Sequence, residues 1–143
     1  MMKLYLIFTK KGLAVILALT VLALIIIGQF SSVNNGYADG STHRERMEFL
    51  AHYKISVNEN AVLVKETRLP QEASGYFSDY NKIVQKGGFD LTDFLGKAVT
   101  VYSYNLKEIP EKTVNLIILN GKIIAGDISD NSKGNIAPIL KEK

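Results

Sequence analysis

The chain has 143 residues with no Cys and no Trp, and its formal net charge is +3. This length accommodates one folded domain at most. The absence of Cys excludes a disulfide framework, a thiolate metal site, a Cys nucleophile and a lipid-modified Cys. With only two His residues, a His-rich metal site is not expected either.

The positive charge belongs to the N-terminal tip, where Lys3, Lys10 and Lys11 precede a long apolar run. These are three of the 17 Lys and Arg residues, so the rest of the chain has 14 of them against 14 Asp and Glu. A nucleic-acid-binding domain needs a basic patch on its folded part. The balance of charges therefore argues against a nucleic-acid partner.

The apolar run, residues 12–28, contains Thr20 as its single polar side chain. As a helix it measures about 25 Å, which is enough for a short membrane span. No positive charge follows it until Arg44. The positive-inside rule therefore predicts a transmembrane helix with the basic tip, residues 1–11, in the cytoplasm and the C-terminal part outside.

An uncleaved anchor and a cleaved signal peptide both fit this segment. The apolar core Leu13–Ile27 reaches the upper length limit of a signal peptide, and residues 36–38 (Gly-Tyr-Ala) offer a small-x-small cleavage site before Asp39. Residues 29–41 are rich in Ser, Asn and Gly, which predicts a flexible linker. The protein is expected in the cell membrane with a single pass, or secreted if the chain is cut near Ala38.

Residues 42–143 are expected to form one extracytoplasmic domain. Its elements in chain order are a helix over 42–54, a strand over 61–69, a helix between Ser74 and Gly87, a helical turn over 91–95, and strands over 98–106, 113–119 and 122–128. The signals are local: a capping box from Thr42 to Glu45, glycines at 87–88 as a helix stop, and Asp90 as a cap. The pair Asn120-Gly121 predicts a tight hairpin.

The tail, Ser129–Lys143, is polar up to Ile136, and we expect its apolar residues to place a last segment on the core. Strands joined by a tight hairpin are antiparallel. An antiparallel sheet with one solvent-exposed face needs its other face covered by other elements. The expected fold is therefore α+β, with two amphipathic helices packed on one face of an antiparallel sheet of about four strands, behind the N-terminal transmembrane helix.

Aromatic, glycine and polar residues of the middle segment carry a resemblance over about residues 44–140. They are Tyr80, Asn81, Gln85, Gly87 to Leu91, Phe94, Gly96, Lys97, Val99, Val101 to Tyr104, and the hairpin Leu116 to Asp127. The pattern resembles small membrane-anchored or secreted proteins of Gram-positive bacteria that are classed as a domain of unknown function. The resemblance implies an extracytoplasmic domain and no known activity, ligand or catalytic residue. Residues 121–127 are also similar to the last hairpin of PepSY-type modules, which are thought to inhibit or assist neighbouring proteins.

No motif predicts catalysis or a cofactor. The chain lacks H-E-x-x-H, P-loop, G-x-S-x-G and S-x-x-K patterns. His43 and His52 have no carboxylates at ligand spacing. Asp127, Asp130 and Asn131 offer oxygen ligands for calcium, but the EF-hand spacing is missing and such residues are also ordinary turn formers. We therefore expect no enzyme, no cofactor and no metal site.

Three side chains are candidates for partner binding: Thr100, Tyr102 and Tyr104, which alternate on one side of a predicted strand. Tyrosine combines an apolar body with a polar tip and suits recognition surfaces. If the helices cover the other face of the sheet, these side chains are presented to a partner or to glycan. The alternative is that both tyrosines belong to the core.

Three functions remain open. The favoured one is a non-enzymatic, membrane-anchored interaction domain that binds a protein partner in the cell envelope, since exposed sheet edges pair with other chains. One alternative is a domain that binds or acts on envelope polymer or a small ligand, which would need a concave pocket with paired carboxylates. The other is an assembly factor of a membrane complex, in which the apolar helix itself makes the contacts.

Overall fold

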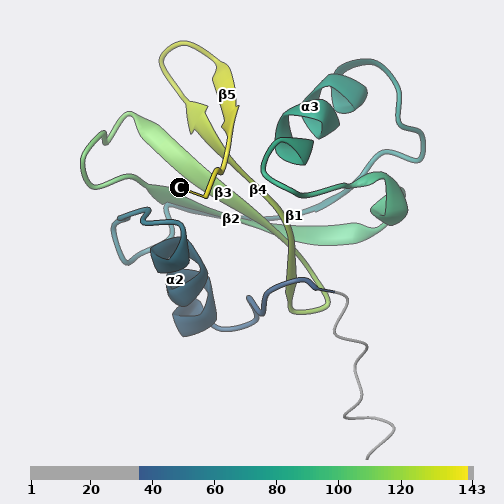
Figure 1. Cartoon of the computed structure of the whole chain (residues 1–143). Coiled ribbons are helices and arrows are strands. Elements are labelled where there is room, and N and C mark those ends of the chain that lie inside the picture. The colour runs from purple at the N-terminus through teal and green to yellow at the C-terminus, as the bar shows by residue number, and fades with distance from the viewer. Residues whose placement is uncertain (1–35, 142–143) are drawn as a thin grey trace, which may run out of the picture. The chain divides into compact units, whose positions relative to one another are not determined.

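The computed structural model describes residues 36–141, and the chain from Tyr37 onward forms one unit. Its elements are α2 (His43–His52), β1 (Leu63–Arg68), α3 (Gly75–Gln85), a short 3₁₀ helix η1 (Thr92–Phe94), β2 (Ala98–Asn105), β3 (Lys112–Leu119), β4 (Lys122–Asp130) and β5 (Asn135–Pro138) (Figure 1). The predicted α+β class is confirmed. The apolar run at 12–28 lies outside the described residues, and within them no helix is long and apolar enough to cross a membrane.

The sheet has five antiparallel strands in the order β1-β2-β3-β4-β5, with α3 inserted between β1 and β2 (Figure 1). The prediction of about four strands therefore misses β5. The missing strand comes from the polar tail, where the Asp130 carboxylate accepts the backbone N–H groups of Ser132 and Lys133 and turns the chain back along β4. Behind this strand Ile139 is fully buried, as expected for a last segment on the core.

Local chemistry sets the ends of the elements, as predicted. The Thr42 hydroxyl accepts the Glu45 N–H at 3.2 Å and the Glu45 carboxylate accepts the Thr42 N–H at 2.8 Å, which completes the capping box of α2. Ser74 precedes α3 but makes no side-chain capping bond. Asn120 and Gly121 both have positive φ, 49° and 77°, as a type I′ hairpin turn requires.

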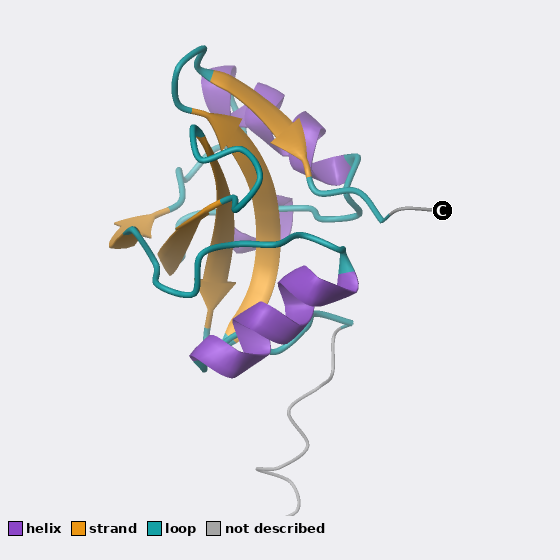
Figure 2. Ribbon diagram, turned by 90° about the vertical axis from the view of Figure 1, so that its left-hand side faces the viewer, coloured by secondary structure: helices purple, strands orange, loops and turns teal. Residues whose placement is uncertain are grey.

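The two helices contact opposite faces of the sheet, so the prediction that both cover one face is wrong. Ser103 and Asp127 lie in one row across β2, β3 and β4, and Tyr104 lies in the neighbouring row. Adjacent residues of a strand point to opposite faces. Arg46 of α2 hydrogen-bonds Tyr104, whereas Tyr80 of α3 hydrogen-bonds Asp127. The long β1–β2 connection carries α3 across the sheet to lie beside β5, away from α2 (Figures 1 and 2).

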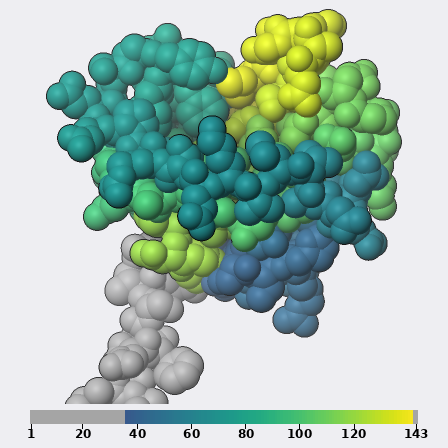
Figure 3. All heavy atoms as spheres, turned by 180° about the vertical axis from the view of Figure 1, so that it is seen from behind, coloured from purple at the N-terminus to yellow at the C-terminus, as the bar shows by residue number. Residues whose placement is uncertain are grey.

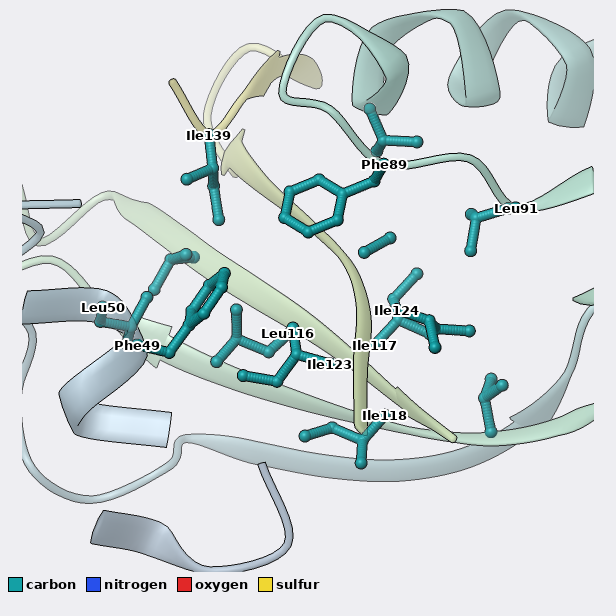
Figure 4. Packing of buried hydrophobic residues seen from close by; sticks show 14 of the residues in the cluster. Phe49, Leu50, Phe89, Leu91, Leu116, Ile117, Ile118, Ile123, Ile124 and Ile139 are labelled. Atoms are coloured by element: carbon teal, nitrogen blue, oxygen red, sulfur yellow. The ribbon is translucent and has the colours of Figure 1, made fainter. Parts of the chain in front are cut away.

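One hydrophobic core joins these layers (Figure 4). Phe49 of α2 lies near Phe89 from the segment after α3, with ring centroids 6.3 Å apart, and Leu50 and Leu91 are buried in the same cluster. The sheet contributes buried side chains of β3 and β4: Leu116, Ile117, Ile118, Ile123 and Ile124. Burying such a side chain stabilises a fold by about 1.5–3 kcal/mol.

The last part of the predicted linker, residues 37–41, belongs to the domain. Asp39 and Lys122 form a β-bridge and an ion pair at 2.6 Å. The Ile123 N–H donates to the Ala38 carbonyl at 2.9 Å. We call residues 37–41 the connector. The peptide bond between Ala38 and Asp39, the candidate cleavage position, lies inside this paired segment.

Candidate functional site

Strand β1 forms one edge of the sheet, and β2 is its only neighbour in the described sheet. All six of its residues are exposed. Val62, directly before the strand, and Leu63 and Val64 at its start are three consecutive apolar side chains with exposed fractions of 55%, 52% and 54%. Figure 3, the view from behind, shows this part of the chain as a dark teal band across the surface. An exposed edge strand is a template for pairing with another chain.

The backbone of β1 points alternately toward β2 and toward solvent. The Leu69 N–H donates to the Lys97 carbonyl at 2.9 Å, which continues the β1–β2 register. Because hydrogen-bonded residues alternate along an antiparallel pair, Val64 and Glu66 direct their N–H and C=O groups to the open edge. Beside the apolar half of β1, its charged half carries Lys65, Glu66 and Arg68.

The predicted partner-binding face is covered at Tyr104. This side chain is fully buried, and its hydroxyl accepts the Arg46 Nε–H at 2.8 Å. Tyr102 is half-buried beneath the Arg46 guanidinium, whose carbon lies 3.7 Å from the ring centroid, and Thr100 is half-buried as well. The expectation that these side chains form an uncovered face is therefore wrong for Tyr104, because α2 packs on that face.

Arg46 is a buried cation that joins the connector to the sheet. Its Nη1 donates to the carbonyls of Gly40 at 2.8 Å and Ser41 at 3.0 Å. Within residues 36–141 it forms no ion pair with a carboxylate. Charge-assisted hydrogen bonds and the Tyr102 ring offset its desolvation. This role was not predicted from the sequence, although Arg46 lies four residues before Leu50, on the same side of the helix.

A second buried charged group, Asp127, lies under α3. Its Oδ2 accepts the Tyr80 hydroxyl at 2.7 Å, its Oδ1 accepts the Asn115 Nδ2–H at 2.9 Å, and the residue is 4% exposed. Burial raises the pKa of the Asp127 carboxyl, although both hydrogen bonds act in the opposite direction. Burial, followed by the neighbouring Asp127 charge, raises the pKa of the Tyr80 hydroxyl. No local pattern indicates that Tyr80 and Asp127, 47 positions apart, would meet.

Some of the residues that carry the family resemblance form a hydrogen-bonded cluster around Asp90, which we call the Asp90 cluster. The Asp90 carboxylate accepts the Thr92 N–H at 2.9 Å and the side-chain amides of Asn81 and Gln85 at 3.1 and 2.9 Å. The Asn81 Oδ1 accepts the Leu91 N–H at 2.8 Å. These bonds, the Thr92 backbone bond first, lower the pKa of Asp90. The Asp90 carboxylate thus accepts the N–H of the first residue of η1, as a cap would, although the residue at the N-cap position is Leu91, which makes no side-chain capping bond.

Gly87, which lies close to the Asp90 cluster in the chain, leaves no space for a side chain. A Cβ there would lie 2.5 Å from the Ile139 carbonyl oxygen and 3.2 Å from that of Val84. We expect Gly87→Ala to lower the free energy of unfolding by about 2 kcal/mol, the scale of overpacking. Urea unfolding measures this, with the neighbouring exposed residue in Lys86→Ala as control. Equal midpoints for the two variants would contradict the packing argument.

The candidate metal ligands are not brought together. His43 and His52 both lie on α2, separated by about 13.5 Å of helix rise and half a turn. Strand alternation puts Asp127 and Asp130 on opposite faces of β4, and the Asn131 amide bonds across to β3. No group of three or more His, Asp or Glu side chains within residues 36–141 is arranged to hold a metal ion.

Comparison with known proteins gives one result. No curated protein and no solved structure matches the chain significantly. A family model covers residues 49–128, which include β1, the Asp90 cluster and the Tyr80–Asp127 contact. Arg46 lies before the matched residues. The chain belongs to the family described as Domain of unknown function (DUF4830).

Proposed function

We propose that the chain is a membrane-anchored, extracytoplasmic interaction domain without enzymatic activity, which binds an extended strand of a protein partner along β1. The observation that carries this proposal is the open edge of β1, where Val62, Leu63 and Val64 are each more than half exposed. Apolar side chains on an unpaired edge expose a fold to unwanted association unless a partner covers them. Pairing with an added strand covers the side chains and satisfies the backbone groups together.

The location outside the membrane is supported by the sequence. The basic tip at 1–11 followed by the apolar run at 12–28 favours an N-terminus in the cytoplasm. The resemblance to exported proteins of Gram-positive bacteria, and to PepSY-type modules, supports the same placement. An equal number of acidic and basic residues after the run suits a domain that recognises a strand by pairing and apolar contact.

The chemistry of β1 specifies the partner strand. Val64 and Glu66 offer backbone donors and acceptors to it. Beside Val62 to Val64 the partner strand needs apolar side chains. Beside Lys65 and Arg68 it needs acidic ones, because opposite charges across a strand pair are favourable and like charges are not.

The test is a photo-crosslinking amino acid in place of Val64 in the full-length chain, in living cells. We expect one discrete adduct from this position and none from Tyr76, a 77% exposed residue on α3. The adduct should disappear when Glu66→Pro is added, because proline removes the outward N–H. The β1–β2 ladder stays intact because its bonds come from the flanking residues Lys65 and Thr67.

Two outcomes would overturn this function. One is the same set of adducts from positions 64 and 76, which would show random collision. The other is a position-64 adduct that Glu66→Pro leaves unchanged, which would show contact without strand pairing. Thermal unfolding of the Glu66→Pro variant confirms that the domain still folds.

A further inference from the structure

We infer that the bond between Ala38 and Asp39, the candidate cleavage position, is closed to proteases in the folded chain, so that the domain keeps residues 37–41 and its link to the N-terminal segment. The inference rests on the proposed function, since it explains how an interaction domain stays attached to its membrane anchor. The connector decides this, because separate contacts fix its middle and both of its ends to the domain.

The middle of the connector is paired with the β3–β4 hairpin (Figure 1). The Ile123 N–H donates to the Ala38 carbonyl at 2.9 Å, and the Gly40 N–H donates to the Gly121 carbonyl at the same distance. These bonds lie on either side of Asp39, whose carboxylate also accepts a hydrogen bond from the Lys122 ammonium at 2.6 Å. The carbonyl of the candidate cleavage bond is therefore itself an acceptor in the folded structure.

Hydrolysis of this bond needs the same carbonyl oxygen. A protease attacks the carbonyl carbon and stabilises the charge on the oxygen with hydrogen-bond donors or a metal ion. The Ala38 oxygen is already bonded to the Ile123 N–H, so the hairpin occupies the place of those donors. Cleavage therefore requires the connector to leave the hairpin first, and its rate follows the population of that open form.

The two ends of the connector make this opening more costly. At one end Tyr37 packs edge-on against Phe94 of η1, with ring centroids 5.5 Å apart. At the other end the buried Arg46 donates to the carbonyls of Gly40 and Ser41 at 2.8 and 3.0 Å. Opening thus breaks contacts with η1, the hairpin and α2 together.

A cut at this position would also damage the domain. It would remove Tyr37 from Phe94, and it would remove the carbonyl that accepts the N–H of the fully buried Ile123. A buried donor without an acceptor is destabilising. By its contacts the folded domain begins at Tyr37 and not at Asp39.

Limited digestion tests the inference with an endoproteinase that cuts the peptide bond before Asp, since Ala38–Asp39 is such a bond. The substrate is the full-length chain in detergent micelles with Asn34→Asp added. This substitution creates an equivalent bond before the connector, in the stretch that the sequence predicts as a linker. We expect the bond before residue 34 to be cut at least about ten-fold faster than the bond before Asp39.

Gly40→Ala in the same background should remove most of this difference. Gly40 is buried, and a Cβ there would lie 2.5 Å from the Ile123 side chain and 2.7 Å from that of Ile118. The added methyl group therefore forces the connector away from the hairpin.

Lys122→Glu is a second variant, which leaves the apolar core unchanged. It replaces the ion pair with Asp39 by repulsion and should raise the rate of the cut before Asp39 about five-fold. Lys86→Glu makes the same change of charge at an exposed position on another element and should leave the rate unchanged. Thermal unfolding confirms that each variant is folded.

Equal rates at the two bonds before any further substitution would overturn the inference. So would a Lys122→Glu rate no higher than that of Lys86→Glu. In cells, mass spectrometry of the chain from membranes and medium should find residues 37–41 attached to the domain, and a chain that begins at Asp39 would overturn the inference.

The proposed function fails separately. A cut before Tyr37 in cells would leave the connector on the domain, as inferred here, but would remove the membrane anchor. Loss of the proline-sensitive adduct at position 64 would reject binding along β1 without changing the digestion result.

Discussion

Replacing Arg46 by Ala is expected to lower the free energy of unfolding by about 3 kcal/mol, because it leaves two buried polar groups without a partner at about 1–3 kcal/mol each. These are the Tyr104 hydroxyl and the Gly40 carbonyl, which the guanidinium contacts at 2.8 Å each. The Tyr102 ring also loses its cation. Urea unfolding of the folded domain, residues 37–143, measures the change.

Arg44→Ala is the matched control for this prediction. Arg44 lies on the same helix, is exposed, and pairs with Glu48 at 3.6 Å, so its removal should cost less than about 0.5 kcal/mol. Arg46→Lys should remain well below the natural stability, since an ammonium lacks the planar fork that reaches several acceptors. Equal losses for Arg46→Ala and Arg44→Ala would show that the guanidinium does not join the connector to the sheet.

Replacing Asp127 by Ala is expected to cost about 3 kcal/mol, because two buried donors lose their acceptor. They are the Tyr80 hydroxyl and the Asn115 amide. Tyr80→Phe should cost about 1 kcal/mol, since it removes one hydrogen bond and leaves Asn115 bound. Tyr76→Phe, on the exposed side of the same helix, should change nothing. Chemical unfolding measures the free energy of unfolding of each variant. A loss of stability in Tyr80→Phe no larger than that in Tyr76→Phe would contradict the contact.

The same carboxyl predicts a pH dependence. Burial raises the pKa of Asp127 in the folded state above its ordinary value of 3.8, so the folded chain holds this proton more tightly than the unfolded chain. The resulting stability is fully present below pH 3.8 and is lost as the pH rises through the folded pKa. Asp90 acts in the opposite sense, because its lowered pKa stabilises the fold at higher pH.

Comparison with Asp127→Asn isolates this contribution, because Asp90 titrates in both proteins. The free energy of unfolding of the natural chain should fall relative to that of Asp127→Asn as the pH rises from 4 toward 8. Chemical unfolding at several pH values gives this difference. A difference that stays constant over the range would mean that Asp127 titrates alike in the folded and unfolded chain.

The sequence by itself determined the local features of this protein. The capping box at Thr42, the stop after Gln85, the Asp90–Thr92 turn and the Asn120-Gly121 hairpin all depend on residues a few positions apart. Such features follow from backbone conformation and neighbouring hydrogen bonds, which the order of residues already contains. Strand alternation and hairpin chemistry were also enough for the α+β class.

Only the tertiary structure decided which faces are covered and which edge is open. Tyr104 was a candidate for an uncovered face and Arg46 carries a charge, yet the placement of α2 buries both. The meeting of Tyr80 with Asp127 and the docking of the connector on Lys122 likewise depend on contacts across 47 and 83 residues. Burial and edge exposure are properties of the assembled layers, because they depend on what lies beside a residue in space rather than along the chain.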